Sequence, residues 1–403
     1  MNSISDRSGG AHVYKILFFL SYATYYGIYC LFLSFMVTYL TQSGYSPLFC
    51  GVAGTAAYLI GMVTQPIAGY ITDAVLSLRH CLIILCLIAA GSSLWMGPAL
   101  ASPLSTLLCV MLISACTTPL MSLLDVWAVS SEKKYPEIRF SFVRSGGSLG
   151  YGALSFVMGA AVHNLGIQII FPVQTLLCVL LVLLLLGLPK GEANNQTGAS
   201  PAPLWRSVAL ITRDRRFCMI VTLLLLYWLT HRVIGGYLAL LVDEVGGDTG
   251  TFGVVTSAGA FAEIVIPLFF SKWIRSQNLK RLLWICLCTN LVRPLSFFLA
   301  AKYGLAYLIF GQIIQSLGFS IYFTASIKCL SQAAPEQIRN TAISLGLAMT
   351  NLLGTVLANL WGGILINWFG TMWLIPISLL LGTVTMILYA GCAGMMELTG
   401  KRE

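Results

Sequence analysis

The sequence predicts an all-α membrane protein in which twelve transmembrane helices form two pseudo-symmetric six-helix bundles. Three observations lead to this fold class: an apolar composition, a regular series of long apolar runs, and a short motif of the first half that recurs in the second half. Of the 403 residues, 58% are hydrophobic and 9% are charged. A soluble domain carries roughly a quarter charged residues, so these few could not cover a water-facing surface of this size.

Long apolar runs separated by short polar links mark the expected spans. A run of about 18 or more apolar residues is typical of a membrane-spanning helix, because a helix satisfies its own backbone hydrogen bonds inside lipid. In the first half we predict spans at 14–40, 48–73, 81–99, 104–128, 141–165 and 167–188. In the second half we predict spans at 217–242, 250–272, 282–302, 304–330, 340–367 and 370–392.

One long polar segment, 189–216, divides the chain into a bundle at 1–188 and a bundle at 217–403. Its Gly, Ala, Asn, Ser and Pro content is typical of a linker. The motif Pro136–Arg139 before the fifth span returns as Pro335–Arg339 before the eleventh. This offset of about 200 residues indicates parallel six-helix repeats.

The loop charges predict the orientation and the location. With both termini and the linker in the cytoplasm, nearly all loop lysines and arginines lie inside, and only Lys302 lies outside. This asymmetry follows the positive-inside rule for a multi-pass protein of the cell's inner (plasma) membrane. The net charge of +9 sits at helix ends rather than on one face, so no nucleic-acid partner is expected.

The sequence does not favour an enzyme. Its twelve cysteines lie almost all in apolar runs, without metal-ligand or disulfide spacing, as expected of small buried hydrophobic residues. No nucleophile motif, metal cluster or nucleotide-binding loop is present in the sequence, so no cofactor and no metal are expected. The expected partners are a small-molecule substrate, protons and the lipid bilayer, with no obligatory protein partner.

A few charges lie inside the predicted spans, where each costs about 2.5–3.5 kcal/mol to insert. Glu263 and Arg293 are the deepest, and we interpret them as a proton-coupling site; the alternative is a structural ion pair. Asp125 and Arg144 lie nearer the cytoplasmic ends, where snorkelling is the alternative to substrate binding. His231 and Arg232 are adjacent and face about 100° apart, so at most one is expected to line a cavity squarely.

The first span carries a stripe of tyrosines at helical spacing: Tyr22, Tyr25, Tyr26 and Tyr29. Four tyrosine hydroxyls in the middle of a span each need a hydrogen-bond partner. This need favours a polar cavity over helix packing or an interfacial belt. We therefore place Tyr22 and Tyr26 at the substrate site. The glycines around Gly146–Gly150 are expected to let two helix backbones approach closely.

The segment Gly69–Asp73, followed by Arg79, resembles the loop motif between the second and third spans of the major facilitator superfamily, although Ala74 replaces the usual basic residue. The chain resembles more closely the lactose permease branch, with its nucleoside–proton symporter and 3-phenylpropionate transporter relatives. The residues that carry this resemblance are Leu124-Asp125, the stretch Arg144–Tyr151, and Arg293.

The resemblance implies that Asp125 and Arg144 bind substrate together, that Tyr151 stacks on a ring, and that Arg293 assists proton release. It also places Ser148 and Gln315 at the substrate site. Gln315 and Gly318 stand where lactose permease has its histidine and proton-carrying glutamate, and Tyr227 and Thr230 replace acidic residues of its seventh span. The proton route is therefore expected to differ from that of lactose permease.

The favoured function is secondary active transport by alternating access, as proton-coupled symport of a sugar, a nucleoside or a similar small polar solute. Two other transport functions stay open: antiport export of amphipathic compounds, and uptake of an aromatic carboxylate. A membrane-bound enzyme or a receptor is the third class, which no motif supports.

Overall fold

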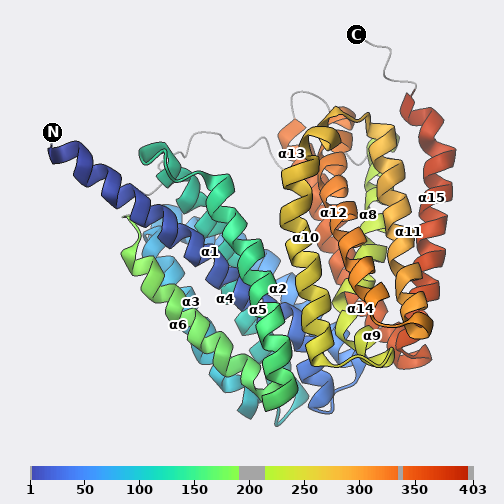
Figure 1. Ribbon diagram of the computed structural model, residues 1–403, viewed down its shortest axis with the longest axis horizontal. Helices are drawn as coiled ribbons and strands as arrows, with labels where there is room; N and C mark the ends of the chain where they lie inside the picture. Colours follow the sequence, from blue (N-terminus) through green and yellow to red (C-terminus); the bar gives the residue numbers. More distant parts are fainter. Residues whose placement is uncertain (1, 190–213, 335–338, 398–403) are drawn as a thin grey trace. The chain divides into compact units, whose positions relative to one another are not determined.

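The computed structural model describes residues 2–189, 214–334 and 339–397, and within these residues every regular element is a helix (Figure 1). The predicted linker 189–216 and the second echo motif at 335–339 lie largely outside the described residues. The prediction that the linker is cytoplasmic falls on the same segment.

The first half contains α1 (Asn2–Gln42), α2 (Pro47–Ala74), α3 (Leu78–Ala99), α4 (Pro103–Lys134), α5 (Phe140–Leu165) and α6 (Ile170–Gly187). The second half contains α8 (Arg215–Gly236), α9 (Leu238–Glu244), α10 (Thr249–Ser276), α11 (Leu279–Tyr303) and α12 (Ala306–Ala333). It continues with α13 (Arg339–Leu347), the π-helical turn Ala348–Leu352, α14 (Leu353–Phe369) and α15 (Leu374–Glu397).

Among the described residues, eleven helices are long and apolar enough to cross a membrane. α5 is not one of them, because its glycines, its serines and Arg144 lower its hydropathy. With 26 residues it is nevertheless long enough, since a span needs about 20. The predicted spans match these helices to within a few residues, and the all-α membrane fold is confirmed.

The predicted seventh span, 217–242, is wrong in one respect, because the helix breaks at Tyr237. α8 ends at Gly236, and α9 begins at Leu238. Gly235 and Gly236 weaken the helix at this point. The Tyr237 hydroxyl donates a hydrogen bond to the Asn359 carbonyl, and this distant contact holds the break in place.

The two halves repeat one local turn, which extends the echo seen in the sequence. Gly166 adopts a φ of 85° before the 3-10 turn Ile167–Ile169 that leads into α6. Gly370 adopts a φ of 89° before the 3-10 turn Thr371–Trp373 that leads into α15. Only glycine tolerates this backbone conformation readily, so both corners depend on it.

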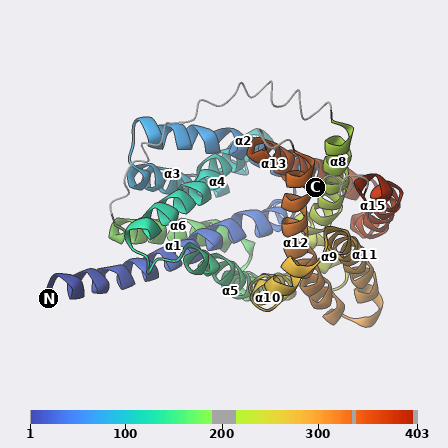
Figure 2. The same cartoon turned by 90° about the horizontal axis from the view of Figure 1, so that it is seen from above.

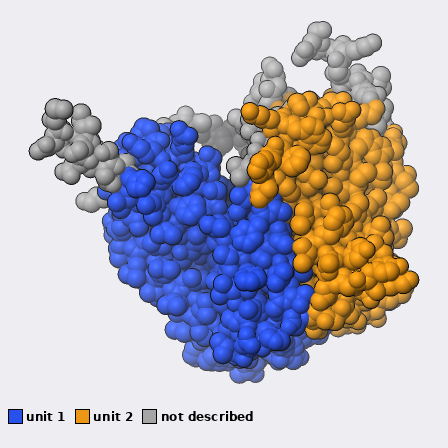
Figure 3. All heavy atoms as spheres, in the orientation of Figure 1, with its two compact units in different colours: residues 1–197, 248–264 blue, residues 198–247, 265–403 orange. Residues whose placement is uncertain are grey.

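The helices form two compact units, residues 1–197 with 248–264 and residues 198–247 with 265–403 (Figure 3). In the first unit α1 packs against α5 and α6, while α2 and α3 pack against α4 (Figure 2). In the second unit α8 packs against α14 and α15, and α11 packs against α12 and α15. Each unit has an apolar core of its own.

The beginning of α10 belongs to the first unit, although the sequence places it in the second bundle. A Cβ built on Gly159 of α5 would lie 2.6 Å from the Cα of Gly253 of α10. The two helices therefore meet backbone to backbone, as small residues in membrane helices allow. The division of the chain into bundles at 1–188 and 217–403 stays a prediction.

Candidate functional site

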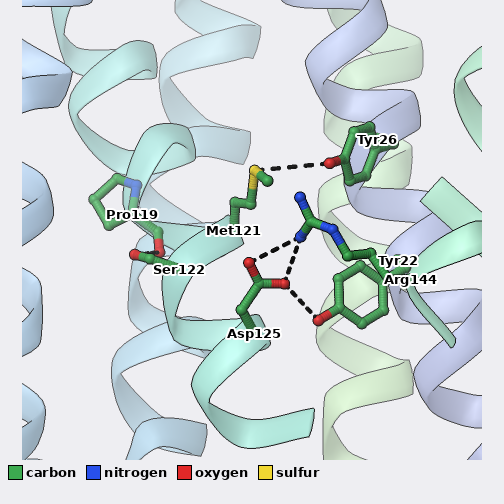
Figure 4. A network of polar contacts seen from close by, with 7 residues as sticks. All are labelled: Tyr22, Tyr26, Pro119, Met121, Ser122, Asp125 and Arg144. Atoms are coloured by element: carbon green, nitrogen blue, oxygen red, sulfur yellow. Dashed lines mark hydrogen bonds and ion pairs between the residues drawn. The ribbon is translucent and has the colours of Figure 1, made fainter. Parts of the chain in front are cut away.

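The first unit brings Asp125 of α4, Arg144 of α5 and Tyr22 of α1 together (Figure 4). Nη1 of Arg144 donates to Oδ1 and Oδ2 of Asp125 at 2.7 and 2.8 Å. The Tyr22 hydroxyl donates to the same Oδ1 at 2.7 Å. The Arg144 and Asp125 side chains are 34% and 29% exposed. A charged pair and a phenol thus meet where they are only partly covered, and their charge-assisted bonds are the strong kind.

Arg144 of α5 lies beside Tyr22 of α1 because these two helices approach very closely. A Cβ on Gly146 would lie 2.5 Å from the Phe19 carbonyl oxygen, and one on Gly150 would lie 2.5 Å from the Cα of Ala23. These glycines face backbone atoms of α1, and any larger side chain would push the helices apart. The prediction of close backbone approach at Gly146–Gly150 is confirmed.

The tyrosine stripe of α1 divides into two pairs by burial. Tyr22 and Tyr25 are buried, whereas Tyr26 and Tyr29 are half-buried. The Tyr26 hydroxyl points toward Met121 of α4, with 3.8 Å between oxygen and sulfur (Figure 4). Tyr22 and Tyr26 therefore face α4 and the Asp125 cluster, as expected of side chains that line a polar site.

Tyr151 and Ser148 lie further along α5, and both side chains are half-buried. The Tyr151 hydroxyl shares a hydrogen bond of 2.6 Å with Ser34 of α1. Ser34 is a contact that the sequence reasoning missed, and no local signal marks it, because twelve residues turn a helix about 120° away from Tyr22. The role of Tyr151 in stacking on a substrate ring and that of Ser148 in binding stay predictions.

The second unit holds a buried arginine, Arg293 of α11, which is 3% exposed. Its Nη1 donates to the His231 carbonyl at 2.9 Å, and its Nη2 donates to Oε1 of Gln312 at 3.0 Å. Gln312 was missed by the sequence reasoning, which chose Gln315, three residues later on α12. Gln315 is half-buried, and its role stays a prediction.

Aromatic rings surround His231 in the same unit. The His231 ring lies 5.3 Å from the Trp228 ring and 6.1 Å from the Phe319 ring, at interplanar angles of 25° and 20°. Tyr322 stacks on Tyr227 at 4.6 Å and on Trp228 at 5.3 Å. We call these five residues the aromatic stack. His231 is a packed member of this stack, and Arg232, the next residue, is half-buried.

A π-helical turn places one more polar side chain beside the aromatic stack. Asn351 lies in the turn Ala348–Leu352, and its Oδ1 accepts a hydrogen bond of 2.9 Å from the Tyr322 hydroxyl. The Asn351 carbonyl accepts from Thr355, whose hydroxyl also receives the Trp228 Nε1–H at 2.9 Å. Turns of this kind occur frequently at functional sites, and no local sequence signal marks this one.

Glu263 and Arg293 belong to different units, so their predicted pairing stays a prediction. Within the first unit, Glu263 is near enough to Tyr26 for the two to interact electrostatically. Gly318, which stands at the position of the lactose permease glutamate, is tightly enclosed. A Cβ there would lie 2.5 Å from Oγ1 of Thr289. A side chain larger than that of glycine, such as glutamate, therefore does not fit at this position.

Asp248 lies in the loop between α9 and α10, and local hydrogen bonds affect its pKa. Hydrogen bonds from the Thr251 N–H and hydroxyl, at 2.7 Å each, lower the pKa of Asp248, and His163 at 2.9 Å adds to the effect. Asp248 thereby caps the first turn of α10. In the part of the chain that the structure describes, no group of three His, Cys, Asp or Glu side chains could hold a metal ion.

Comparison with known proteins identifies the family. The MFS_1 like family matches residues 12–376. The chain belongs to this family of the major facilitator superfamily. The "Probable 3-phenylpropionic acid transporter" of Escherichia coli (strain K12) is 26% identical over 338 residues, which cover 82% of this chain and 86% of that protein. The maltose permease of Geobacillus stearothermophilus is 22% identical over 215 residues, 53% of each chain.

Solved structures of transporters share the fold. The nucleoside transporter NupG superposes with a TM-score of 0.82 at 16% identity, over 95% of this chain and 99% of that one. A D-xylose-proton symporter superposes with a TM-score of 0.69 at 13% identity, over 94% and 97%. The chain is a multi-pass membrane transporter of the lactose permease-like branch, and it is not an enzyme.

Proposed function

We propose that this transporter is a proton-coupled symporter that takes up a small polar organic solute by alternating access. The observation that carries the proposal is the cluster of Asp125, Arg144 and Tyr22 in the first unit. A solute hydroxyl that entered this cluster would accept from the guanidinium and donate to the carboxylate, and both bonds would be charge-assisted. Sugars and nucleosides carry such hydroxyls, and both classes appear in the names of similar transporters.

Two substitutions test the substrate role of this cluster. Asp125→Asn keeps the size of the side chain and removes its charge, whereas Arg144→Lys keeps the charge and loses the planar fork. Each variant should remain folded and inserted, yet lose substrate uptake and ligand-induced thermal stabilisation. Ser145→Ala is the matched control, because Ser145 bonds only the Phe142 carbonyl of its own helix. Normal uptake by both variants would assign the pair a structural role.

Glu263 is the proposed proton-coupling site, with Arg293 as the residue that tunes it. Burial and a nearby arginine have opposite effects on a carboxyl group's proton affinity. A movement that alternately joins and separates the two would therefore switch proton binding, as symport requires. Glu263→Gln should exchange substrate down equal gradients and lose proton-driven accumulation. Substrate-dependent alkalinisation of a lightly buffered cell suspension at the normal rate would rule Glu263 out and make Asp125 the next candidate.

Uptake of an aromatic carboxylate is a second candidate, which the aromatic stack of the second unit favours. Phe319 is the half-buried member of the stack and offers a ring face to a substrate ring, and the similar Escherichia coli protein is named for 3-phenylpropionic acid. Export of amphipathic compounds by antiport is the third. Right-side-out and inverted vesicles separate uptake from export, because the imposed proton gradient drives the solute in opposite directions.

Both termini and the segment 189–216 are proposed to be cytoplasmic, because nearly all loop lysines and arginines then lie inside. In a cysteine-free background, Asn195→Cys should react with an impermeant thiol reagent only after the membrane is opened. Its reaction from outside intact cells would reverse the orientation.

A further inference from the structure

Arg293 is a buried cation whose partners are neutral. The guanidinium has five N–H donors, and its two hydrogen bonds go to the His231 carbonyl and to the Gln312 amide oxygen. Its Nε–H is buried and has no hydrogen-bond partner among the residues that the structure describes. A buried charge normally requires an opposite charge and full hydrogen bonding. Arg293 therefore has both charge and a donor to offer to an anion.

The second unit has no carboxylate inside its spans to balance Arg293. Its acidic residues lie at helix ends, in loops or near the C-terminus: Asp214, Asp243, Glu244, Glu336, Glu397 and Glu403. Across both units, the span interiors hold three arginines at 144, 232 and 293 and two carboxylates at 125 and 263. Three arginines and two carboxylates leave one positive charge without an opposite charge whenever Glu263 and Arg293 are apart, and Arg293 then has only neutral hydrogen-bond partners.

We propose that Arg293 binds the carboxylate of a monoanionic aromatic substrate, whose ring lies against Phe319, the half-buried member of the aromatic stack. Binding would supply the missing negative charge and a partner for the unused donor, and arginine is well suited to carboxylate because its fork matches the two oxygens. His231 links the two features, because its carbonyl holds Arg293 while its ring lies in the stack. This inference rests on the proposed carrier function and develops its second candidate, the uptake of an aromatic carboxylate.

Gly235 is an exposed residue that lies next to the arginine. A Cβ built on it would lie 3.8 Å from Nη2 of Arg293, the only atom within 4 Å. A small side chain there would fit in ordinary contact, whereas a long one would cover the guanidinium. Gly235 is thus a position where access to Arg293 can be blocked while the arginine itself is kept.

Thermal stabilisation of the purified protein is the direct test, with 3-phenylpropionate as the probe at neutral pH. Its uncharged analogue 3-phenylpropionamide controls for the ring, and uridine represents neutral hydroxylated solutes. We expect 3-phenylpropionate to raise the melting temperature and the amide to bind at least about tenfold more weakly, since a bond to a charged group is lost. Arg293→Gln should lose the preference for the acid over the amide, and Arg293→Lys should keep part of it.

Gly235→Leu keeps Arg293 and covers its guanidinium. This variant therefore tests whether Arg293 binds the carboxylate even if Arg293→Gln does not fold. We expect this variant to lose 3-phenylpropionate stabilisation while it melts near the temperature of the unliganded parent. Gly391→Leu is the matched control, because Gly391 is an exposed helical glycine of α15 with no atom within 4 Å of a built Cβ. It should bind 3-phenylpropionate as the parent does.

Two results would overturn the inference. One is equal stabilisation by the acid and the amide, and the other is stabilisation by uridine with none by 3-phenylpropionate. In that second case, uptake of uridine by proteoliposomes would support the carrier function. Only the inference that the substrate is an aromatic anion would then be wrong. Absence of both stabilisation and uptake with all three probes would count against the inference and the proposed carrier function together.

Discussion

Gly150→Ala tests the close approach of α1 and α5 that brings Tyr22 and Arg144 into one cluster. The added Cβ would lie 2.5 Å from the Cα of Ala23, where an ordinary carbon contact is about 3.5 Å. The helices would have to move apart by about 1 Å, because the opposing atoms are backbone and cannot rotate away. Overpacking of this kind costs about 1–3 kcal/mol, and the backbone contact suggests the upper part of that range.

Gly91→Ala is the control, because Gly91 is an exposed glycine inside α3 with no atom within 4 Å of a built Cβ. Both variants gain the helix preference of alanine, about 1 kcal/mol, so their difference isolates the overpacking. Melting curves in detergent should place Gly150→Ala several degrees below Gly91→Ala, at about 2–4 °C per kcal/mol. Substrate affinity should fall with it. Equal melting temperatures would refute the close approach.

Three further substitutions have defined outcomes. Tyr22→Phe should weaken substrate binding by about tenfold or more, because it removes a hydrogen bond to a charged group; isothermal titration measures this. Gln312→Leu should lower the melting temperature, whereas Gln315→Leu should lower only substrate affinity, because only Gln312 bonds Arg293. Asp248→Ala should destabilise α10 by about 1 kcal/mol, and Asp248→Asn by less, because asparagine also caps.

Each of these predictions has a contrary result. Unchanged substrate binding by Tyr22→Phe would show that the Tyr22 hydroxyl does not contribute to binding. Equal melting temperatures of Gln312→Leu and Gln315→Leu would show that the hydrogen bond from Arg293 to Gln312 does not stabilise the protein. For Asp248 the sign with pH is fixed: its folded pKa is depressed, so its contribution is present above the unfolded value of about 3.9 and is lost as the pH falls below it. An effect of Asp248→Ala that grew with acidity would contradict the capping role.

Sequence alone predicted the spans well, because insertion in lipid depends on local composition. It also predicted the meeting of Asp125 with Arg144, although the resemblance to lactose permease carried part of that expectation. The break at Tyr237 was only partly predictable: Gly235 and Gly236 mark a weak point of the helix, whereas the hydrogen bond from Tyr237 to Asn359 joins residues more than a hundred positions apart.

The rotation of a helix about its own axis is a second feature that the sequence leaves open. Gln312 and Gln315 are both polar and lie nearly on one face of α12, so only packing against α11 selects Gln312 as the partner of Arg293. The same limit applied to residues 248–264, whose place in the first unit depends on the contact of Gly253 with Gly159. Tertiary contacts, not propensity, decide such positions.

Proton-driven uptake by the reconstituted protein is the direct test of whether this carrier is a proton-coupled symporter. Proteoliposomes would take up radiolabelled 3-phenylpropionate, or uridine in a parallel experiment, with the outside acidic and then without a pH gradient; protein-free liposomes correct for passive entry of the weak acid. We expect protein-dependent accumulation that requires the gradient and disappears in Asp125→Asn. Uptake of both solutes no greater than in protein-free liposomes, or accumulation that is the same without a gradient, would contradict it.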